Sequence, residues 1–288
     1  MKRRAVSIII VAYNSSNKID KLLKSLILNC KYINEVIVIE NNSPDRNATH
    51  RKCEKYSNKI KLTFVENENV GFGRSCNKGA SLSKGDQILF LNPDTELKTS
   101  SIQILLNHME LTHADIIGGK TISYKGEIHG SVVRAPNIAV GLFEFTNLGK
   151  LFNIKKWHKY FYYEDRKMSL TDEDQLVDAV SGAYLLITRK AFQRLNGFDM
   201  NIYMYLEDVD LGIRANEMGM RVVYCPHSEI WHIGGASSND VHKIHHKAWY
   251  DSRKYYFKKH FGVLTNAILQ PIFVTEEFVF KFINRIRE

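Results

Sequence analysis

Four short apolar runs alternate with amphipathic segments over the first 91 residues, and this alternation constrains the fold more than any other feature. The runs are Ala5–Ala12, Glu35–Glu40, Lys61–Val65 and Ile88–Leu91. Runs rich in β-branched and aliphatic residues are typical of strands that are buried on both faces of a parallel sheet. Apolar residues between the first two runs recur at the spacing of a helix that faces a core. They are Ile19, Leu22, Leu23, Leu26 and Ile27. We therefore expect a doubly wound α/β fold.

The fourth run stops at a proline that is flanked by two oxygen-bearing side chains, Asn92 and Asp94. In an open α/β sheet, ligands bind where the carboxyl ends of the strands meet. A carboxylate and an amide oxygen at that place suit a hard cation, Mg²⁺ or Mn²⁺, which takes its other ligands from water and substrate phosphates. The alternative is an Asx turn, in which both side chains only bond nearby amides.

Polar loops follow the other expected strands as well. They are Tyr13–Ser15, Asn41–Asp45 and the glycine-containing segment Asn69–Arg74. Right-handed crossover connections place all of these loops on one edge of the sheet. The sequence thus predicts a cleft to which several strands contribute.

A second polar cluster lies far along the chain, where Glu207, Asp208 and Asp210 stand at the expected start of a helix. Acidic residues in a first turn favour the helix dipole, and Asp210 can pair with Arg214, so a purely structural explanation exists. A carboxylate pair that points into a cleft would also suit general-base chemistry on a hydroxyl. His232, which follows another expected strand, is a candidate metal ligand or a structural histidine.

Two regions are rich in aromatic and basic residues. Residues 137–167 are irregular, and we interpret them as a loop or lid over the cleft or a surface for a large partner, with ordinary surface helix as the alternative. Residues 249–262 are followed by an apolar segment, 266–287, that Glu276, Glu277 and Lys281 interrupt. Such a segment suits a membrane interface, a helix packed on the domain or a contact with a second subunit.

Composition narrows the class of partner and the compartment. The chain has 288 residues and a formal net charge of +9, which favours an anionic partner. A nucleic-acid binder would explain this charge but would leave the acidic cluster unexplained. The four cysteines show no metal-ligand or disulfide spacing, which indicates free thiols in a reducing compartment. No uninterrupted apolar run approaches the roughly 18 residues of a membrane span, so we expect a cytoplasmic protein, soluble or attached to the inner face of a membrane.

Taken together, several motifs resemble those of family 2 inverting glycosyltransferases, and in particular the rhamnosyltransferase-like branch. They are Val-Ser-Ile-Ile-Ile-Val-Ala-Tyr-Asn, the turn over residues 40–45, Asn-Val-Gly-Phe-Gly-Arg, Leu-Asn-Pro-Asp-Thr, Ser-Gly-Ala, Gly-Phe-Asp and Tyr-Leu-Glu-Asp-Val-Asp-Leu. The resemblance implies a GT-A fold, which is a doubly wound, mostly parallel Rossmann-like sheet. It also implies a nucleotide-sugar-binding half over 1–97, an acceptor and catalytic half over 98–236 and a helical extension over 237–288.

The resemblance also implies roles for individual residues. Asp208 matches the catalytic base, beside Glu207, and Gly182, Ala183 and Glu207 match acceptor contacts. Asp94 matches the metal ligand, with Asn92 and His232 as further ligands of Mn²⁺ or Mg²⁺. The positions that match donor contacts are Ala12, Tyr13, Asn14, Glu40, Asn69, Gly73, Arg74, Asn77, Asn92 and Asp94.

Two of these positions depart from the family pattern. The family more often has Asp where this chain has Glu40, and Asn92 replaces the first carboxylate of its metal motif. Glu40 is one methylene longer than that Asp, so its contact to the donor is kept, shifted or lost, and we expect it to be kept. The second departure leaves Asp94 as the principal metal ligand.

The function that the resemblance implies is transfer of one sugar, rhamnose or a hexose, to a hydroxyl of a glycan or lipid-linked saccharide of the cell envelope. The donor would be a deoxythymidine diphosphate rhamnose or a UDP-hexose. A processive polysaccharide synthase is excluded because its Gln-x-x-Arg-Trp signature is absent. A non-catalytic sugar-nucleotide-binding protein and a sugar nucleotidyltransferase remain alternatives, as does a homodimer.

Overall fold

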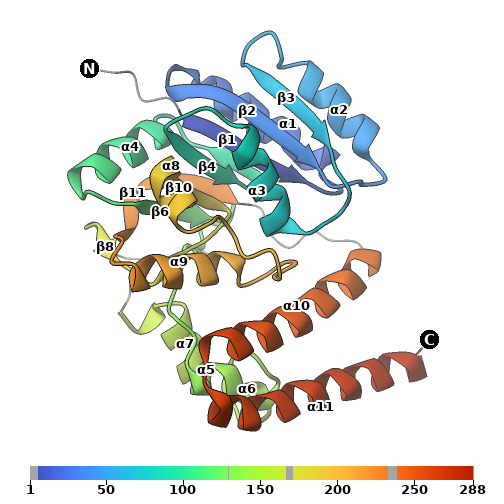
Figure 1. Ribbon diagram of the computed structural model, residues 1–288. Coiled ribbons are helices and arrows are strands. Elements are labelled where there is room, and N and C mark those ends of the chain that lie inside the picture. The colour runs from blue at the N-terminus through green and yellow to red at the C-terminus, as the bar shows by residue number, and fades with distance from the viewer. Residues whose placement is uncertain (1–5, 129, 167–170, 233–238, 288) are drawn as a thin grey trace.

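The computed structural model describes residues 6–128, 130–166, 171–232 and 239–287. Its centre is a mostly parallel, nine-stranded sheet in the order β3-β2-β1-β4-β10-β6-β11-β5, with β8 paired to β11 (Figure 1). The strands are β1 Val6–Ala12, β2 Ile33–Glu40, β3 Leu62–Glu66, β4 Gln87–Leu91, β5 Thr95–Leu97, β6 Ile116–Ile122, β8 Gln175–Leu176, β10 Tyr184–Thr188 and β11 Val222–His232. The predicted α/β fold class is confirmed.

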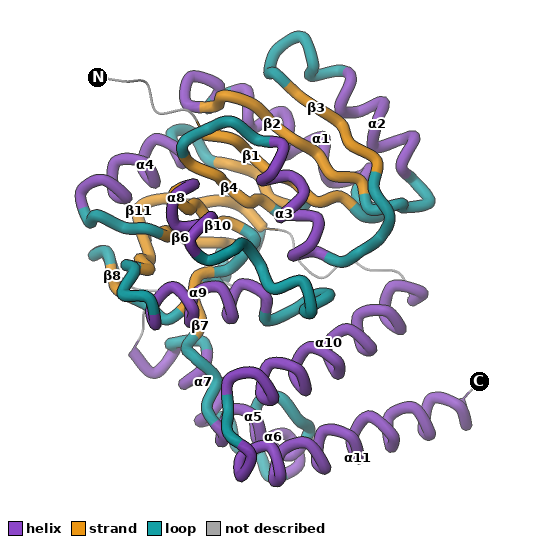
Figure 2. Tube along the Cα trace, viewed as in Figure 1, coloured by secondary structure: helices purple, strands orange, loops and turns teal. Residues whose placement is uncertain are grey.

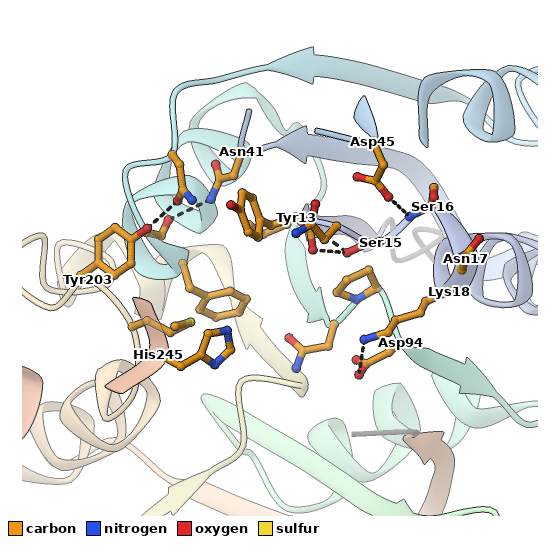
Figure 3. Close-up of a pocket in the computed structure, with 18 residues that line it drawn as sticks. Tyr13, Ser15, Ser16, Asn17, Lys18, Asn41, Asp45, Asp94, Tyr203 and His245 are labelled. Carbon is orange, nitrogen blue, oxygen red and sulfur yellow. Dashed lines mark hydrogen bonds and ion pairs between the residues drawn. The ribbon is translucent and has the colours of Figure 1, made fainter. Parts of the chain in front are cut away.

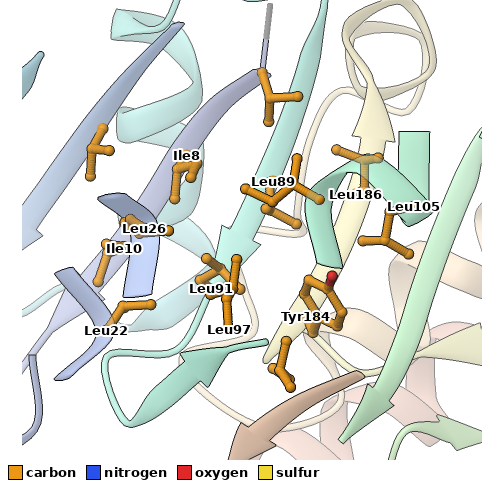
Figure 4. Close-up of a cluster of buried hydrophobic side chains, with 14 of the residues drawn as sticks. Ile8, Ile10, Leu22, Leu26, Leu89, Leu91, Leu97, Leu105, Tyr184 and Leu186 are labelled. Carbon is orange, nitrogen blue, oxygen red and sulfur yellow. The ribbon is translucent and has the colours of Figure 1, made fainter. Parts of the chain in front are cut away.

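Helices cover both faces of the sheet, because side chains alternate along each buried strand. Ile8 and Ile10 face α1 (Ser16–Ile27) and α4 (Ser101–Leu111), as Figure 4 shows for part of this core. Ile9 and Val11 pack on the opposite side with α3 (Phe72–Leu82), α8 (Arg189–Arg194) and α9 (Glu207–Glu217). Helix α2 (Arg46–Glu54) contributes Cys53 to the first core. This two-sided burial explains why the strands carry continuous apolar runs.

The register aligns the carboxyl ends of the first strands. Ala12 pairs with Glu40, and Ile10 pairs with Leu91. The loops after β1, β2 and β4 therefore leave the sheet at one edge. The antiparallel strand β10 lies between β4 and β6 and brings the preceding turn, residues 181–183, to the same edge.

Two stretches of β structure are irregular. Residues 177–188 form two strands, β9 (Ala179–Val180) and β10, separated by the 181–183 turn, and β9 pairs with β7 (Val132–Val133) instead of the main sheet. Strand β11 continues through Pro226 to His232 because a bulge between Cys225 and Glu229 accommodates the proline.

The region 137–167, expected to be irregular, contains three short helices among its described residues. These are α5 (Ile138–Phe143), α6 (Leu148–Leu151) and α7 (Lys156–Phe161). They gather at the joined end of two long helices, α10 (Asn239–His260) and α11 (Val263–Arg287), as Figure 2 shows. Phe145, Phe161, Phe257 and Phe273 form the centre of the apolar cluster between these elements. The segment is therefore a packed helical layer. Short 3₁₀ turns occur at Cys30–Tyr32 and Glu164–Arg166.

Helix α11 has one property of a membrane segment. Its portion Val263–Phe282 is long and apolar enough to cross a bilayer by length and composition. The predicted boundary at residue 236 lies outside the described residues. The four cysteines are free, as expected.

Candidate active site

A cavity of about 670 Å³ opens at the carboxyl edge of β1, β2 and β4. The loop after β1 and the first turn of α1 form one wall, and the turns after β2 and β4 form two others. The segment that leads into α3 and the residues before α9 complete it, together with His245 of α10 (Figure 3). The lining residues are Val11, Tyr13, Asn14, Ser15, Ser16, Asn17, Lys18, Asn41, Asp45, Asn69, Gly71, Phe72, Asn92, Pro93, Asp94, Tyr203, Met204 and His245. The predicted cleft thus has walls from six separate segments.

Asp94 stands at one end of this cavity between two basic side chains. Its Oδ1 lies 3.3 Å from His232 Nε2 at the end of β11, and its Oδ2 lies 3.9 Å from Lys18 Nζ. Burial by itself would raise the pKa of Asp94, but the hydrogen bond and charge of His232, with Lys18, outweigh it and hold that pKa below its usual value. Asp94 is therefore a carboxylate at neutral pH.

The donor set around Asp94 fits a divalent cation. A carboxylate and an imidazole converge there, and Asn92 lines the same cavity. One carboxylate with nitrogen and oxygen donors is a set that Mn²⁺ or Mg²⁺ completes with water and phosphate oxygens. Lys18 would have to withdraw from Asp94 as a cation approached, because the two positive charges would compete for the same oxygens.

The Glu207–Asp208 pair begins α9, as the sequence predicts. The two residues before it, Tyr205 and Leu206, have φ angles of 73° and 66°, an unfavourable conformation for side chains other than glycine. This turn sets the direction of the helix start. The main-chain amides of Gly182 and Val209 each donate to the Asp208 carboxylate at 2.8 Å. These bonds stabilise the ionised form of Asp208.

Glu207 differs from its neighbour in environment. It is 7% exposed, and its Oε2 has no hydrogen-bond partner among the described residues. Burial, with the nearby Asp208 charge, raises the pKa of Glu207 to about 8. The pKa of Asp208 is raised as well, by burial, although its amide bonds oppose the shift. The two amide donors favour the charged form on Asp208 rather than on Glu207, so Glu207 is the member of the pair whose neutral form the fold favours.

The 181–183 turn connects the two polar clusters. The main-chain amide of Gly182 donates to Asp208. The Ala183 carbonyl accepts a hydrogen bond from the main-chain amide of Asn92 at 3.2 Å. Phe72, which lines the cavity, lies 3.4 Å from the position of a Cβ on Gly182. Asp208 and Asp94 therefore belong to one continuous region of the molecule.

The structure places the predicted donor contacts in two groups. Tyr13, Asn14, Asn69, Asn92 and Asp94 line the cavity, and Ala12 is buried immediately before it. Glu40, Gly73, Arg74 and Asn77 are not among the lining residues.

The residues of the second group have other contacts. Glu40 is fully buried, accepts hydrogen bonds from Ser43 and borders a separate hollow of about 270 Å³. Arg74 donates to the Met200 carbonyl, and Asn77 bonds both main-chain groups of Phe198. These contacts tie α3 to the segment before α9.

Sequence reasoning did not select several lining residues. The polar ones that were not expected there are Ser16, Asn17, Lys18, Tyr203 and His245, whereas Ser15, Asn41 and Asp45 belong to loops that were expected at the cleft without being selected individually. Asn41 and Asp45 follow the end of β2, so their place after a parallel strand was a usable signal. For Lys18 and His245 no local pattern exists, because the side chains they approach are far away in the sequence.

A mostly parallel α/β sheet with a polar cavity at its carboxyl edge defines the class of nucleotide-binding α/β enzymes. The model of the family described as glycosyl transferase family 2 matches residues 7–192. The chain belongs to this family and is a glycosyltransferase.

Two curated relatives carry a narrower description. The N-acetylglucosaminyl-diphospho-decaprenol L-rhamnosyltransferase of Mycobacterium tuberculosis is 27% identical over 237 residues, which cover 78% of this chain and 75% of that protein. The rhamnosyltransferase WbbL of Escherichia coli is 27% identical over 264 residues, covering 88% of this chain and 87% of that protein. The expected resemblance to the rhamnosyltransferase-like branch is confirmed.

The fold also resembles a solved glycosyltransferase structure. TarS 1–349 of Staphylococcus aureus, in complex with UDP, superposes with a TM-score of 0.54 at 17% identity. The superposition covers 86% of this chain and 65% of that one. At this identity the similarity shows the fold alone.

Proposed function

We propose that this glycosyltransferase moves one sugar, rhamnose or a hexose, from a nucleoside diphosphate donor to a hydroxyl of a glycan or lipid-linked saccharide. The observation that carries the proposal is the connection, through the 181–183 turn, between the cavity that holds Asp94 and the carboxylate of Asp208. The rhamnosyltransferase names of the two relatives support rhamnose as the first donor sugar to test.

In this proposal the cavity holds the donor. Tyr13, Asn14 and Asn69 surround the nucleotide, and the diphosphate points toward Asp94. Asp94, His232 and Asn92 would hold Mn²⁺ or Mg²⁺. When bound, the cation supplies charge neutralisation for the departing diphosphate. Lys18, which also lines the cavity, would add a second positive charge near the diphosphate once it has withdrawn from Asp94.

Asp208 is the general base in this mechanism. Its ionised carboxylate takes the proton from an acceptor hydroxyl while that oxygen attacks the anomeric carbon. The bond from the anomeric carbon to the phosphate oxygen breaks, and the nucleoside diphosphate leaves with the electron pair. Because the oxygen enters opposite to the leaving group, a single displacement inverts the anomeric configuration. Glu207 stays protonated, so the pair carries a single negative charge.

The division of the chain follows from these roles. We assign the donor to residues 1–97 and the acceptor and base to residues 98–236, with residues 237–288 as an extension.

The exposed face of α11 carries seven large apolar residues, which suits contact with a membrane that bears a lipid-linked acceptor. They are Val263, Leu264, Ile268, Val274, Phe278, Val279 and Phe282. The enzyme would then be a cytoplasmic, peripheral membrane protein.

Thermal unfolding with nucleotides tests the donor site. UDP, deoxythymidine diphosphate and GDP are each added with Mn²⁺, with Mg²⁺ or with chelator. A nucleotide at 100 times its dissociation constant should add about 2.7 kcal/mol of stability. We expect one nucleotide to stabilise the chain in a metal-dependent way, and we expect Asp94→Ala to lose that dependence.

Asp172→Ala, which removes an exposed carboxylate outside the cavity, is the matched control and should behave as wild type. If no nucleotide at millimolar concentration shifts the unfolding temperature of wild type, the donor site as described is wrong. Product analysis of the anomeric configuration then tests inversion separately.

A further inference from the structure

A second group of metal-ligating side chains lies away from the cavity. The donor atoms of His108, Asp174 and Cys225 all lie within 4.8 Å of one another. None of these residues lines the cavity described above. The ring centre of His227 lies 4.9 Å from that of His108, so a second imidazole stands beside the group, although it is not part of the set of mutually close donor atoms.

The topology of the sheet brings these residues together from three elements. Gln175 of β8 pairs with Tyr224 of β11 in antiparallel register, so the preceding Asp174 lies beside Cys225. Helix α4 begins near Glu229, where Ser101 donates to its carbonyl, and ends near Arg221. His108, in the last turn of α4, therefore approaches β11 near Cys225. This place is toward the amino-terminal end of β11, whereas His232 and the cavity are at the carboxyl end.

An irregularity in β11 supports the same arrangement. Cys225 pairs with Gly119 and Glu229 pairs with Lys120, so the three residues between them have no place in the ladder. His227 is one of these three, two positions after Cys225. Bulges redirect side chains. This bulge lies where Cys225 and His227 approach His108.

Protein contacts satisfy only some of the polar atoms of the group. His108 Nδ1 lies 2.6 Å from Asp174 Oδ2, which is a good ion pair or hydrogen bond. The other oxygen, Oδ1, is buried and has no hydrogen-bond partner among the described residues. Leaving a buried carboxylate oxygen unsatisfied is costly. Cys225 is 0% exposed, with its sulfur among the same atoms.

We propose that His108, Asp174 and Cys225, with His227 as the fourth ligand, bind a zinc ion. Imidazole nitrogen, thiolate sulfur and carboxylate oxygen in a tetrahedral set are the preferred donors of Zn²⁺. Bonds of about 2.0–2.1 Å require the His108 nitrogen and the Asp174 oxygen to separate from 2.6 Å to about 3.3 Å, which is a small side-chain movement. The site cross-links α4, the strand β11 and the segment before β8. Its role is structural, and it is distinct from the Asp94 site, which offers no sulfur.

The absorption spectrum of the Co²⁺-substituted protein tests this proposal. The full chain is freed of metal with chelator and titrated with Co²⁺. We expect a thiolate-to-cobalt charge-transfer band that saturates at one ion per chain and disappears on addition of one equivalent of Zn²⁺. Cys225→Ser should lose the band. Cys53→Ser, at another buried cysteine, and Asp94→Ala should keep it.

Absence of the band in wild type, or its persistence in Cys225→Ser, would overturn the proposal. If Cys225→Ser does not fold, His227→Ala provides a second test, because His227 is exposed and its loss removes little packing. Cobalt affinity should then fall at least about tenfold, since even outer-shell partners of metal ligands contribute that much. Unchanged cobalt affinity in His227→Ala would contradict the four-ligand site.

Discussion

Glu207 and Asp208 are adjacent carboxylates that the fold treats differently. Asp208 receives two amide hydrogen bonds, whereas Glu207 is buried with one unsatisfied oxygen. Two like charges so close cannot both form at low cost, so the environment decides which residue ionises first. This asymmetry leads to one prediction about stability and one about activity.

The stability prediction concerns Glu207→Gln. The pKa of Glu207 rises from 4.5 to about 8 on folding, because burial, with the Asp208 charge, disfavours its ionised form. The unfolded chain releases this proton above about pH 4.5, so wild type loses stability as the pH rises from there to 8. Glu207→Gln cannot ionise and should be more stable than wild type at pH 8, by a difference on the order of a few kcal/mol.

Urea unfolding at pH 5 and pH 8 measures this difference. It should be small at pH 5 and largest at pH 8 and above. The matched control is Glu66→Gln, at an exposed position, which should follow wild type at both values. If the free energies of unfolding of Glu207→Gln and wild type differ by the same amount at pH 5 and at pH 8, Glu207 is not buried in its neutral form.

The activity prediction concerns Asp208→Asn. Loss of a general base lowers rates by about 10²–10⁴. We expect such a fall in sugar transfer, with nucleotide binding unchanged, and a smaller effect for Glu207→Gln, because glutamine resembles the protonated glutamate. Wild-type transfer should fall in acid, since the raised pKa of Asp208 lets protonation remove the base at a higher pH than for an ordinary aspartate. The test is the rate of sugar transfer by wild type, Asp208→Asn and Glu207→Gln. If Asp208→Asn transfers sugar at a rate within tenfold of wild type, Asp208 is not the base.

At the scale of elements, the start of α3 is held against the segment before α9. The Phe72 amide donates to the Tyr203 carbonyl at 2.8 Å, and the Tyr203 hydroxyl donates to Asn69 at the same distance. Gly71 allows this contact, since its φ is +93° and a Cβ there would lie 2.2 Å from the Tyr203 oxygen. One wall of the cavity thus depends on a position without a side chain.

Gly71→Ala should therefore disturb both stability and nucleotide binding. Gly219→Ala is the matched control, because Gly219 has a φ of +70° with nothing within 4 Å of a new Cβ. The control should cost about 1 kcal/mol, the strain of a left-handed alanine, and leave binding unchanged. Gly71→Ala should cost more and weaken nucleotide binding. Denaturant unfolding and calorimetric titration compare the two, and equal effects would mean that the Tyr203 contact contributes nothing.

The helical layer is joined by a buried charge. Arg253 of α10 is 1% exposed and donates to the Phe145 carbonyl and, at 2.6 Å, to Glu276 of α11. It also lies over the rings of Tyr250 and Phe273. Removing one member of a buried pair leaves the other without its partner. Arg253 thus connects three elements in a single set of contacts.

Arg253→Ala should destabilise the protein by about 3–5 kcal/mol. Lys247→Ala breaks an exposed pair with Asp251 on the same helix and should cost about 0.5 kcal/mol or less, because water screens that pair. Urea unfolding, followed by tryptophan fluorescence, measures both. Similar losses in the two variants would show that the buried pair does not hold the layer together.

At the scale of the whole molecule, helix α11 lies at the outside, away from the sheet (Figure 1), and its large apolar residues named above are exposed. Burying a phenylalanine contributes about 1.5–3 kcal/mol, so two such residues account for much of a peripheral attachment. The net charge of +9 adds attraction to anionic lipids. These two properties favour a membrane as the partner of this face.

The double variant Phe278→Asp/Phe282→Asp should lose binding to anionic lipid vesicles while it retains nucleotide binding. Leu111→Asp changes another exposed apolar residue, on α4, and should bind vesicles like wild type. Co-sedimentation with vesicles measures binding. If wild type ignores vesicles and instead forms a dimer that the double variant loses, the face is a subunit interface.

Elements whose signals are local could be predicted from the amino-acid sequence. The runs at β1, β2 and β4 and the apolar stripe of α1 lie where their periodicity predicts them, and α9 begins at Glu207 as expected. Burial on both faces forces a strand to be apolar throughout, so the doubly wound sheet can be recognised without any long-range information. The residues after these strands could also be placed at one edge, because right-handed crossovers leave no other arrangement.

The contacts between residues far apart in the chain could not be predicted in this way. The insertion of β10 between β4 and β6, the approach of Lys18 and His232 to Asp94, and the position of His245 all join segments far apart in the chain. The same holds for Cys225, whose spacing shows nothing until β8 and α4 bring Asp174 and His108 beside it. Periodicity records only which face of its own element a residue occupies, whereas contacts between elements depend on how the whole chain packs.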